Sequence, residues 1–67
     1  MKKDTFRVIY LNDNITQVAC DGFYQSIILA MAEAIIKGND PRIKYIYNTD
    51  TGVQIENIEY PSFKFSK

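Results

Sequence analysis

A single long segment with a helical period, residues 21–38 (DGFYQSIILAMAEAIIKG), constrains this chain more than any other feature. Its apolar residues recur at three- and four-residue spacing, which is typical of an amphipathic helix. Asp21 is a good N-cap, because its carboxylate can accept hydrogen bonds from the free amides of the first turn. Gly38 suits the C′ position, where a left-handed residue commonly ends a helix. The sequence therefore predicts one helix that runs to about Lys37.

The predicted helix carries more apolar surface than one sheet needs to cover. Its polar positions fall within about one third of the circumference. These positions are Gln25, Ser26, Glu33 and Lys37. Leu29 and Ile36 lie inside this polar stripe. Two interpretations stay open: both are singly exposed apolar residues, which is ordinary, or both contact a second copy or another protein.

Two pairs of short strands are predicted on either side of the helix. Segments 5–11 and 15–20 are rich in β-branched and aromatic residues and flank an Asn-Asp-Asn turn signal. A three-residue loop at 12–14 would place Leu11 opposite Ile15 and Val8 opposite Val18. In that register the core-facing residues are Phe6, Val8 and Tyr10 together with Thr16, Val18 and Cys20, while Arg7 and Gln17 point to the other side.

Segments 42–48 and 53–60 form the second predicted pair, around a Thr-Asp-Thr-Gly turn. A three-residue loop would place Tyr47 opposite Ile55, with Ile43 and Tyr45 on the same apolar face. In this register Lys44 lies near Glu56 and can form a weak cross-strand ion pair.

The predicted fold is one α+β domain over residues 1–67 with the element order ββαββ. It is a four-stranded, mostly antiparallel sheet with one helix packed on one face, and residues 1–4 and 62–67 are expected to be frayed. A domain near 60 residues buries only about 60% of its unfolded surface. Cys20 is the single cysteine, so no intrachain disulfide adds stability. Small size without a covalent staple favours a homodimer.

The residue inventory argues against catalytic and metal chemistry. The chain has no histidine, so it has neither a Ser-His nor a Cys-His pair nor an ordinary zinc ligand set. Cys20 alternates onto the face of Val18, which predicts a buried, unreactive thiol. Glu56 and Glu59 lie three apart on a predicted strand and would point to opposite faces. We therefore expect no enzyme activity, no cofactor and no metal.

Aromatic and basic residues in the second half of the chain suggest one alternative function. They are Arg42, Lys44, Tyr45, Tyr47 and Lys64. Tyrosine rings on a sheet can stack unpaired bases while basic side chains contact phosphates. The formal net charge is zero, however, and proteins that bind nucleic acid are usually basic. Binding of single-stranded nucleic acid is therefore the second hypothesis.

The first hypothesis is a non-catalytic protein-interaction or regulatory module, with a homodimer and a protein partner expected. The residues predicted to make the protein contacts are Leu29, Glu33, Ile36, Phe63 and Phe65. No segment reaches the roughly 20 apolar residues of a membrane span, so no membrane is expected. The lone cysteine and a start without an export signal predict the cytoplasm. The many Ile, Asn, Lys and Tyr residues are typical of AT-rich coding sequences, which suggests an inhibitor of a host protein encoded by a phage or mobile element.

Overall fold

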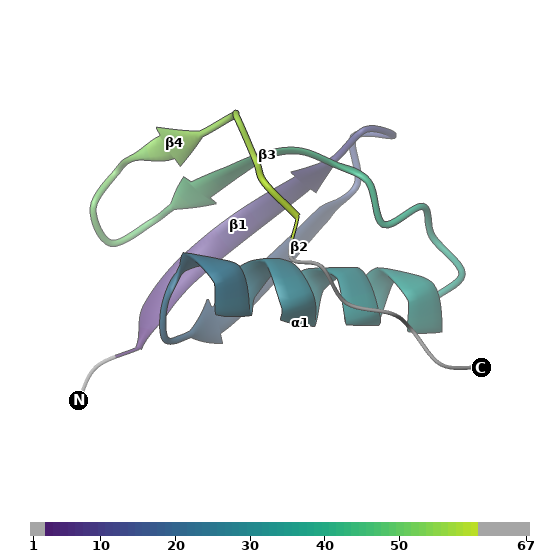
Figure 1. The fold of residues 1–67 in the computed structure, drawn as a ribbon, viewed down its shortest axis with the longest axis horizontal. Coiled ribbons are helices and arrows are strands. Elements are labelled where there is room, and N and C mark those ends of the chain that lie inside the picture. Colours follow the sequence, from purple (N-terminus) through teal and green to yellow (C-terminus); the bar gives the residue numbers. More distant parts are fainter. Residues whose placement is uncertain (1–2, 61–67) are drawn as a thin grey trace.

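The computed structural model describes residues 3–60, and these form a four-stranded antiparallel sheet with one helix on one face (Figure 1). The elements are β1 (Asp4–Tyr10), β2 (Ile15–Cys20), α1 (Phe23–Ile36), β3 (Ile43–Asn48) and β4 (Gln54–Ile55). The strand order is β2-β1-β3-β4, so β2 and β4 are the edges. The predicted α+β class and the ββαββ order are confirmed. Of the segments expected to be frayed, 62–67 lies outside the described residues, and Asp4 is the first residue of β1.

The β1–β2 hairpin turns one residue earlier than predicted. The N–H of Tyr10 donates to the carbonyl of Asn14 (2.9 Å), and the N–H of Asp13 donates back to Tyr10 (2.9 Å). Asp13 has a φ of 67°, a left-handed conformation that aspartate tolerates better than most residues. The loop is therefore 11–13, and Val8 pairs with Thr16 instead of Val18. Because this register shift is two residues, the predicted core face of the hairpin is correct.

The β3–β4 hairpin has a four-residue loop, and its predicted register is wrong by one. The N–H of Asn48 donates to the carbonyl of Val53 (2.8 Å), so Tyr47 lies opposite Gln54 and not Ile55. The side-chain oxygen of Asn48 accepts the N–H groups of the next turn, at positions 50 and 51, and this stabilises the longer loop. A slip of one residue exchanges the faces of a strand. The slip moves Gln54 to the face of Tyr47, while the pairing of β3 with β1, which sets Ile46 opposite Val8 and Tyr47 opposite Arg7, places Ile46 in the core and Tyr47 on the opposite face.

Two further predictions about this half of the chain are wrong. The Nζ of Lys44 contacts Asp13 (2.7 Å) in the first hairpin loop, not Glu56. The last strand ends at Ile55 instead of Tyr60. The chain beyond it crosses the helix side of the sheet, where the Tyr60 hydroxyl accepts from the N–H of Ile43 (2.9 Å).

The helix begins one residue later than predicted and ends as expected. Gly22, not Asp21, is the N-cap, with φ 81° and ψ 155°, and no side chain caps the first turn. That backbone conformation is accessible to glycine at little cost, which decides the position of the cap. At the other end, the N–H of Asn39 donates to Ala34 (2.7 Å) and the N–H of Gly38 donates to Ile35 (3.1 Å), a Schellman motif.

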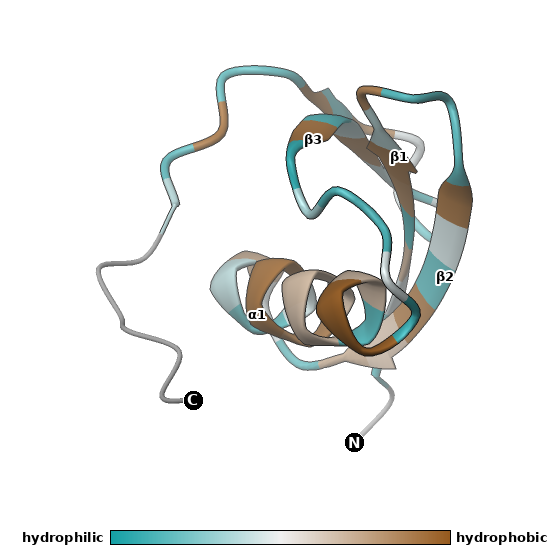
Figure 2. Ribbon diagram, turned by 90° about the vertical axis from the view of Figure 1, so that its right-hand side faces the viewer, coloured by the Kyte–Doolittle hydropathy of each residue, from teal (hydrophilic) through white to brown (hydrophobic). Residues whose placement is uncertain are grey.

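The core lies between α1 and the sheet. Its fully buried residues include Val8, Ile27 and Ile46, and the hydroxyl of Tyr10 donates to the carbonyl of Ala30 (2.7 Å). The helix backbone lies closest to β2 and β1, as the view along its axis in Figure 2 shows, and its buried residues share one core with Ile43 and Ile46 of β3. Ile58, beyond β4, packs against the same core from the other half of the sheet. The fold therefore has one half covered by the helix and another covered by an irregular segment.

Candidate interaction surfaces

The outer surface of α1, meaning the side turned away from the sheet, is largely apolar. Its exposed members are Tyr24 (53%), Leu29 (41%), Ile35 (45%) and Ile36 (84%). One ion pair lies beside them, from Lys37 to Glu33 (2.7 Å). Contiguous exposed apolar side chains on one element commonly mark a binding surface. The expected exposure of Leu29 and Ile36 is thus observed, and Glu33 is half-buried in its pair with Lys37.

Two residues that were not predicted on this surface are exposed there, and one residue that was predicted on the polar stripe is buried. Tyr24 and Ile35 lie outside the predicted polar stripe, but both are exposed. Ser26 was expected on the polar stripe, but it is completely buried and its hydroxyl donates to the carbonyl of Phe23. The common cause is that α1 lies over only two strands, so the arc that it buries is narrower and rotated. Phe63 and Phe65, also predicted to make protein contacts, lie outside the described residues.

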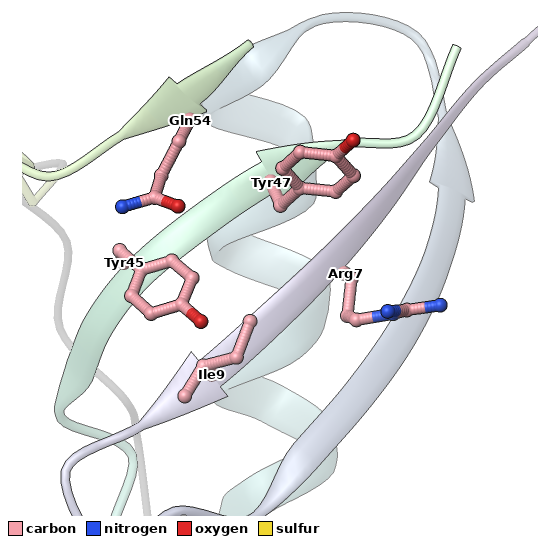
Figure 3. Close-up of a pocket in the computed structure, with 5 residues that line it drawn as sticks. All are labelled: Arg7, Ile9, Tyr45, Tyr47 and Gln54. Carbon is pink, nitrogen blue, oxygen red and sulfur yellow. The ribbon is translucent and has the colours of Figure 1, made fainter. Parts of the chain in front are cut away.

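A shallow hollow of about 320 Å³ lies on the open face of the sheet, opposite α1 (Figure 3). It is lined by Arg7 and Ile9 of β1, Tyr45 and Tyr47 of β3, and Gln54 of β4. The register sets these side chains beside one another, because Arg7 pairs with Tyr47 and Ile9 pairs with Tyr45 across the two central strands. The hollow therefore combines a guanidinium, two aromatic rings and a side-chain amide around an aliphatic residue.

Arg7 differs from most basic side chains of the described chain in having no ion pair there. Lys37, Arg42 and Lys44 are held by Glu33, Asp40 and Asp13 respectively. Arg7 has only neutral neighbours on its face of β1, β2 and β3, because the residues that alternate onto this face carry no carboxylate. They are Thr5, Ile9, Ile15, Gln17, Ala19, Tyr45 and Tyr47. The three strands therefore place no carboxylate beside Arg7 on this face.

The residues predicted to bind nucleic acid are only partly brought together. Tyr45 and Tyr47 meet in the hollow, but Arg42 binds Asp40 through three hydrogen bonds from its guanidinium, the shortest 2.6 Å, outside that site. These bonds from Arg42, with another from its backbone, lower the pKa of Asp40 below the ordinary value. Lys44 is directed to the first hairpin loop, and Lys64 lies outside the described residues.

Sequence reasoning missed Arg7, Ile9 and Gln54 as partners of the two tyrosines. Part of the signal was in the sequence, since the alternation of residues in the first predicted strand already placed Arg7 on the side away from the core. The missing information was the strand order, because β1 pairs with β3 through a contact between residues about 40 positions apart. Regular alternation from Ile43 also assigned both tyrosines to the core face, because the irregularity where β3 pairs with Ile9 and Tyr10 of β1 was not foreseen.

Cys20 is buried, as predicted, and its chemistry is that of a small apolar residue. It is 4% exposed, and burial, followed by the charges of Asp21 and Asp4, raises the pKa of its thiol. A raised pKa keeps the thiol protonated at neutral pH and suppresses nucleophilic reactivity. Within residues 3–60 no group of three acidic, cysteine or histidine side chains is arranged to hold a metal ion.

No helix within the described part of the chain has both the length and the apolar character needed to cross a membrane. Comparison with known proteins assigns no family: no protein-family model matches the chain, and no curated protein and no solved structure matches it significantly.

Proposed function

We propose that this chain is a small non-catalytic protein-interaction module that binds through the outer surface of α1. The observation that carries the proposal is the exposure of Ile36 (84%) together with Leu29, Ile35 and Tyr24 on one 14-residue helix. Burying an exposed isoleucine or leucine in a contact contributes about 1.5–3 kcal/mol each. With the ring of Tyr24, these side chains give the outer surface of α1 an apolar centre around which an interface can form.

The partner of this surface is a second copy of the chain, another protein, or both. A homodimer fits a domain of 67 residues that has a single, buried cysteine and no disulfide. A buried free thiol also agrees with a reducing compartment, so the proposal includes the cytoplasm. Inhibition of a host protein by a phage- or mobile-element-encoded chain is one form of this function.

Sedimentation velocity of the wild type and of two variants, Leu29→Asp and Ile36→Asp, tests the proposal. Each charge placed in the contact should raise the dimer dissociation constant at least about 30-fold, the effect of roughly 2 kcal/mol for a central contact residue. Val53→Asp is a matched control, because Val53 is equally apolar and 53% exposed but lies at the β3–β4 loop. The circular dichroism of all three variants should match that of the wild type.

Two outcomes would contradict this proposal. Unfolding of Leu29→Asp or Ile36→Asp at high concentration would mean that these side chains are needed inside the domain. A wild-type monomer that also retains no protein from a host lysate, at concentrations where the domain is folded, would leave the outer surface of α1 without a role.

A second candidate function is supported by the hollow on the open face. Arg7, which has no carboxylate partner within residues 3–60, lies on β1 beside the half-buried Tyr47 and near the half-buried Tyr45 of β3 (Figure 3). The rings can stack bases, and the guanidinium can bind the connecting phosphate. The absence of carboxylates on this face of β1, β2 and β3 removes local repulsion of a polyanion. We propose single-stranded nucleic acid as the ligand in this alternative.

Fluorescence anisotropy with a labelled deoxythymidine oligonucleotide at low salt tests the alternative. Tyr45→Ala and Arg7→Gln should each weaken binding about tenfold, since stacking is worth about 1–3 kcal/mol per base. Arg42→Gln is the control, because Arg42 is held by Asp40 outside the hollow. No binding at low salt would exclude this function, and equal loss in Arg7→Gln and Arg42→Gln with no loss in Tyr45→Ala would show that only net charge matters.

A further inference from the structure

The edge strand β2 presents three residues whose backbone groups point away from the sheet. Tyr10 and Asn14 form a hydrogen-bonded pair, and such pairs alternate along an antiparallel ladder. The even-numbered residues of β2 therefore bond to β1. Ile15, Gln17 and Ala19 direct their N–H and C=O groups outward, and all three side chains are exposed. Within residues 3–60 the edge is therefore open to a further strand.

Nothing in the sequence of β2 protects this edge. Its six residues, ITQVAC, contain no charge, no proline and no glycine. Natural edge strands are usually shielded by lysine, proline, a bulge or very short length. The opposite edge has that protection, since β4 is only two residues long and is followed by Glu56 and Glu59. Only β2 is long enough to pair with another chain.

We infer that the occupant of this edge is β2 of a second copy, which joins two sheets into one of eight strands. The inference rests on the proposed self-association and specifies its geometry. Pairing is antiparallel about a two-fold axis at Gln17, so that Gln17 faces Gln17 and Ile15 faces Ala19 of the other copy. This register uses all three outward residues of each strand and forms about six hydrogen bonds. An uncharged strand meets its own copy without repulsion.

The position of α1 supports a second copy in preference to another occupant. The helix packs across β2 and β1, at the half of the sheet that ends in the free edge (Figure 1). Neighbouring strands are about 4.8 Å apart, so the two-fold axis brings the two α1 axes to about 10 Å from each other on the same face. Packed helices lie about 8–10 Å apart. The same dimer therefore pairs the edges and lets the outer surfaces of α1 meet.

Cysteine cross-linking tests this register in the Cys20→Ala background. Residues of a hydrogen-bonded antiparallel pair have Cα atoms about 5.5 Å apart, but their Cβ atoms are too far apart for an unstrained disulfide, so a short bifunctional maleimide is the cross-linker. Gln17→Cys should therefore form a covalent dimer with this reagent. Ala19→Cys is the matched control, because two copies of this position would lie about 13 Å apart and should not cross-link. A mixture of Ala19→Cys and Ile15→Cys should cross-link again.

Charge variants at the axis give an independent measurement on the reduced protein. Gln17→Lys or Gln17→Glu alone should raise the dimer dissociation constant about tenfold or more, because like charges face each other across the axis. An equimolar mixture of the two should recover the wild-type affinity as a heterodimer. Gln17 is exposed on the open face, so neither change disturbs the core.

The results separate this inference from the proposed function. If Ile36→Asp dissociates the dimer but Gln17→Cys does not cross-link, the edge pairing is wrong and the role of α1 stands. If Gln17→Cys cross-links while Leu29→Asp and Ile36→Asp leave association unchanged, the edge pairing is right and the proposed role of α1 is wrong. Equal cross-linking of Gln17→Cys and Ala19→Cys overturns the register.

Discussion

The two halves of the sheet differ in what covers their core-facing side. The β1–β2 half is covered by α1, with Val8 and Ile27 fully buried between them. β3 adds Ile43 and Ile46 to the same core, but within residues 3–60 the outer part of the β3–β4 half is covered by the segment beyond β4, through the half-buried Ile58 and the hydroxyl of Tyr60. One short helix therefore lies over two strands, and an irregular segment covers the side of the sheet that it does not reach. The half that lies beneath the helix also carries the free edge and the exposed helix surface.

The largest expected difference is in the unfolding free energy lost when a core side chain is truncated in one half or in the other. Ile27→Ala removes a fully buried side chain beneath α1 and should destabilise the domain by about 2–5 kcal/mol. Ile58→Ala removes a half-buried one and should cost about 1 kcal/mol. Urea unfolding at a fixed protein concentration measures both, because association shifts apparent stability. Equal losses of unfolding free energy in the two variants would contradict the difference between the halves.

The hydroxyl of Tyr10 makes the helix-covered half sensitive to alkaline pH. Burial, the largest cause, raises the pKa of Tyr10 above its ordinary value. A folded-state pKa above the unfolded value means full stability below the unfolded pKa, near 10, and loss as pH rises through the folded pKa. Thermal unfolding should therefore show a fall in stability above about pH 10.

Tyr10→Phe should flatten that alkaline fall and also lower stability at neutral pH by about 1–2 kcal/mol, because the carbonyl of Ala30 loses its donor. Tyr60→Phe is the control in the other half, where the hydroxyl bonds to Ile43 in a more exposed position. If Tyr60→Phe flattens the profile instead, the titration belongs to the β3–β4 half.

The smallest effect is expected from the ion pair that links the two halves. Lys44 reaches Asp13 across the sheet, but both side chains are largely exposed. Exposed ion pairs add little to stability. Lys44→Ala should leave the melting temperature unchanged within error, and a clear decrease would show that the loops fasten the halves together.

The hairpins show why the sequence predicted one half of the fold better than the other. Both predicted registers were wrong, by two residues in the first hairpin and by one in the second. A shift of two residues keeps the faces, so Phe6, Val8 and Tyr10 were placed correctly. Tyr45 and Tyr47 were not, because the pairing of β3 with β1 is irregular at Ile9/Tyr10 and sets Ile46, not Tyr47, toward the core. The side chain of Asn48, through its hydrogen bonds to the next turn, accounts for the longer loop of the second hairpin.

The candidate surfaces could be predicted only where the spacing of residues within one helix or strand was enough to place a side chain. Helical period alone indicated that Leu29 and Ile36 are exposed. The exposure of Tyr24 and the burial of Ser26 depend on how many strands α1 covers, which periodicity does not contain. The hollow around Arg7 depends on the long-range pairing of β1 with β3, for which a single sequence carries no local signal.

The central claim is that the half covered by α1 is where this chain meets its own copy. Residue-resolved amide hydrogen exchange at several protein concentrations tests it most directly. The account predicts that the amides of Ile15, Gln17 and Ala19 become more protected as concentration rises, while those at the exposed β3–β4 loop do not change. Exchange at these three positions that is fast and independent of concentration would contradict it.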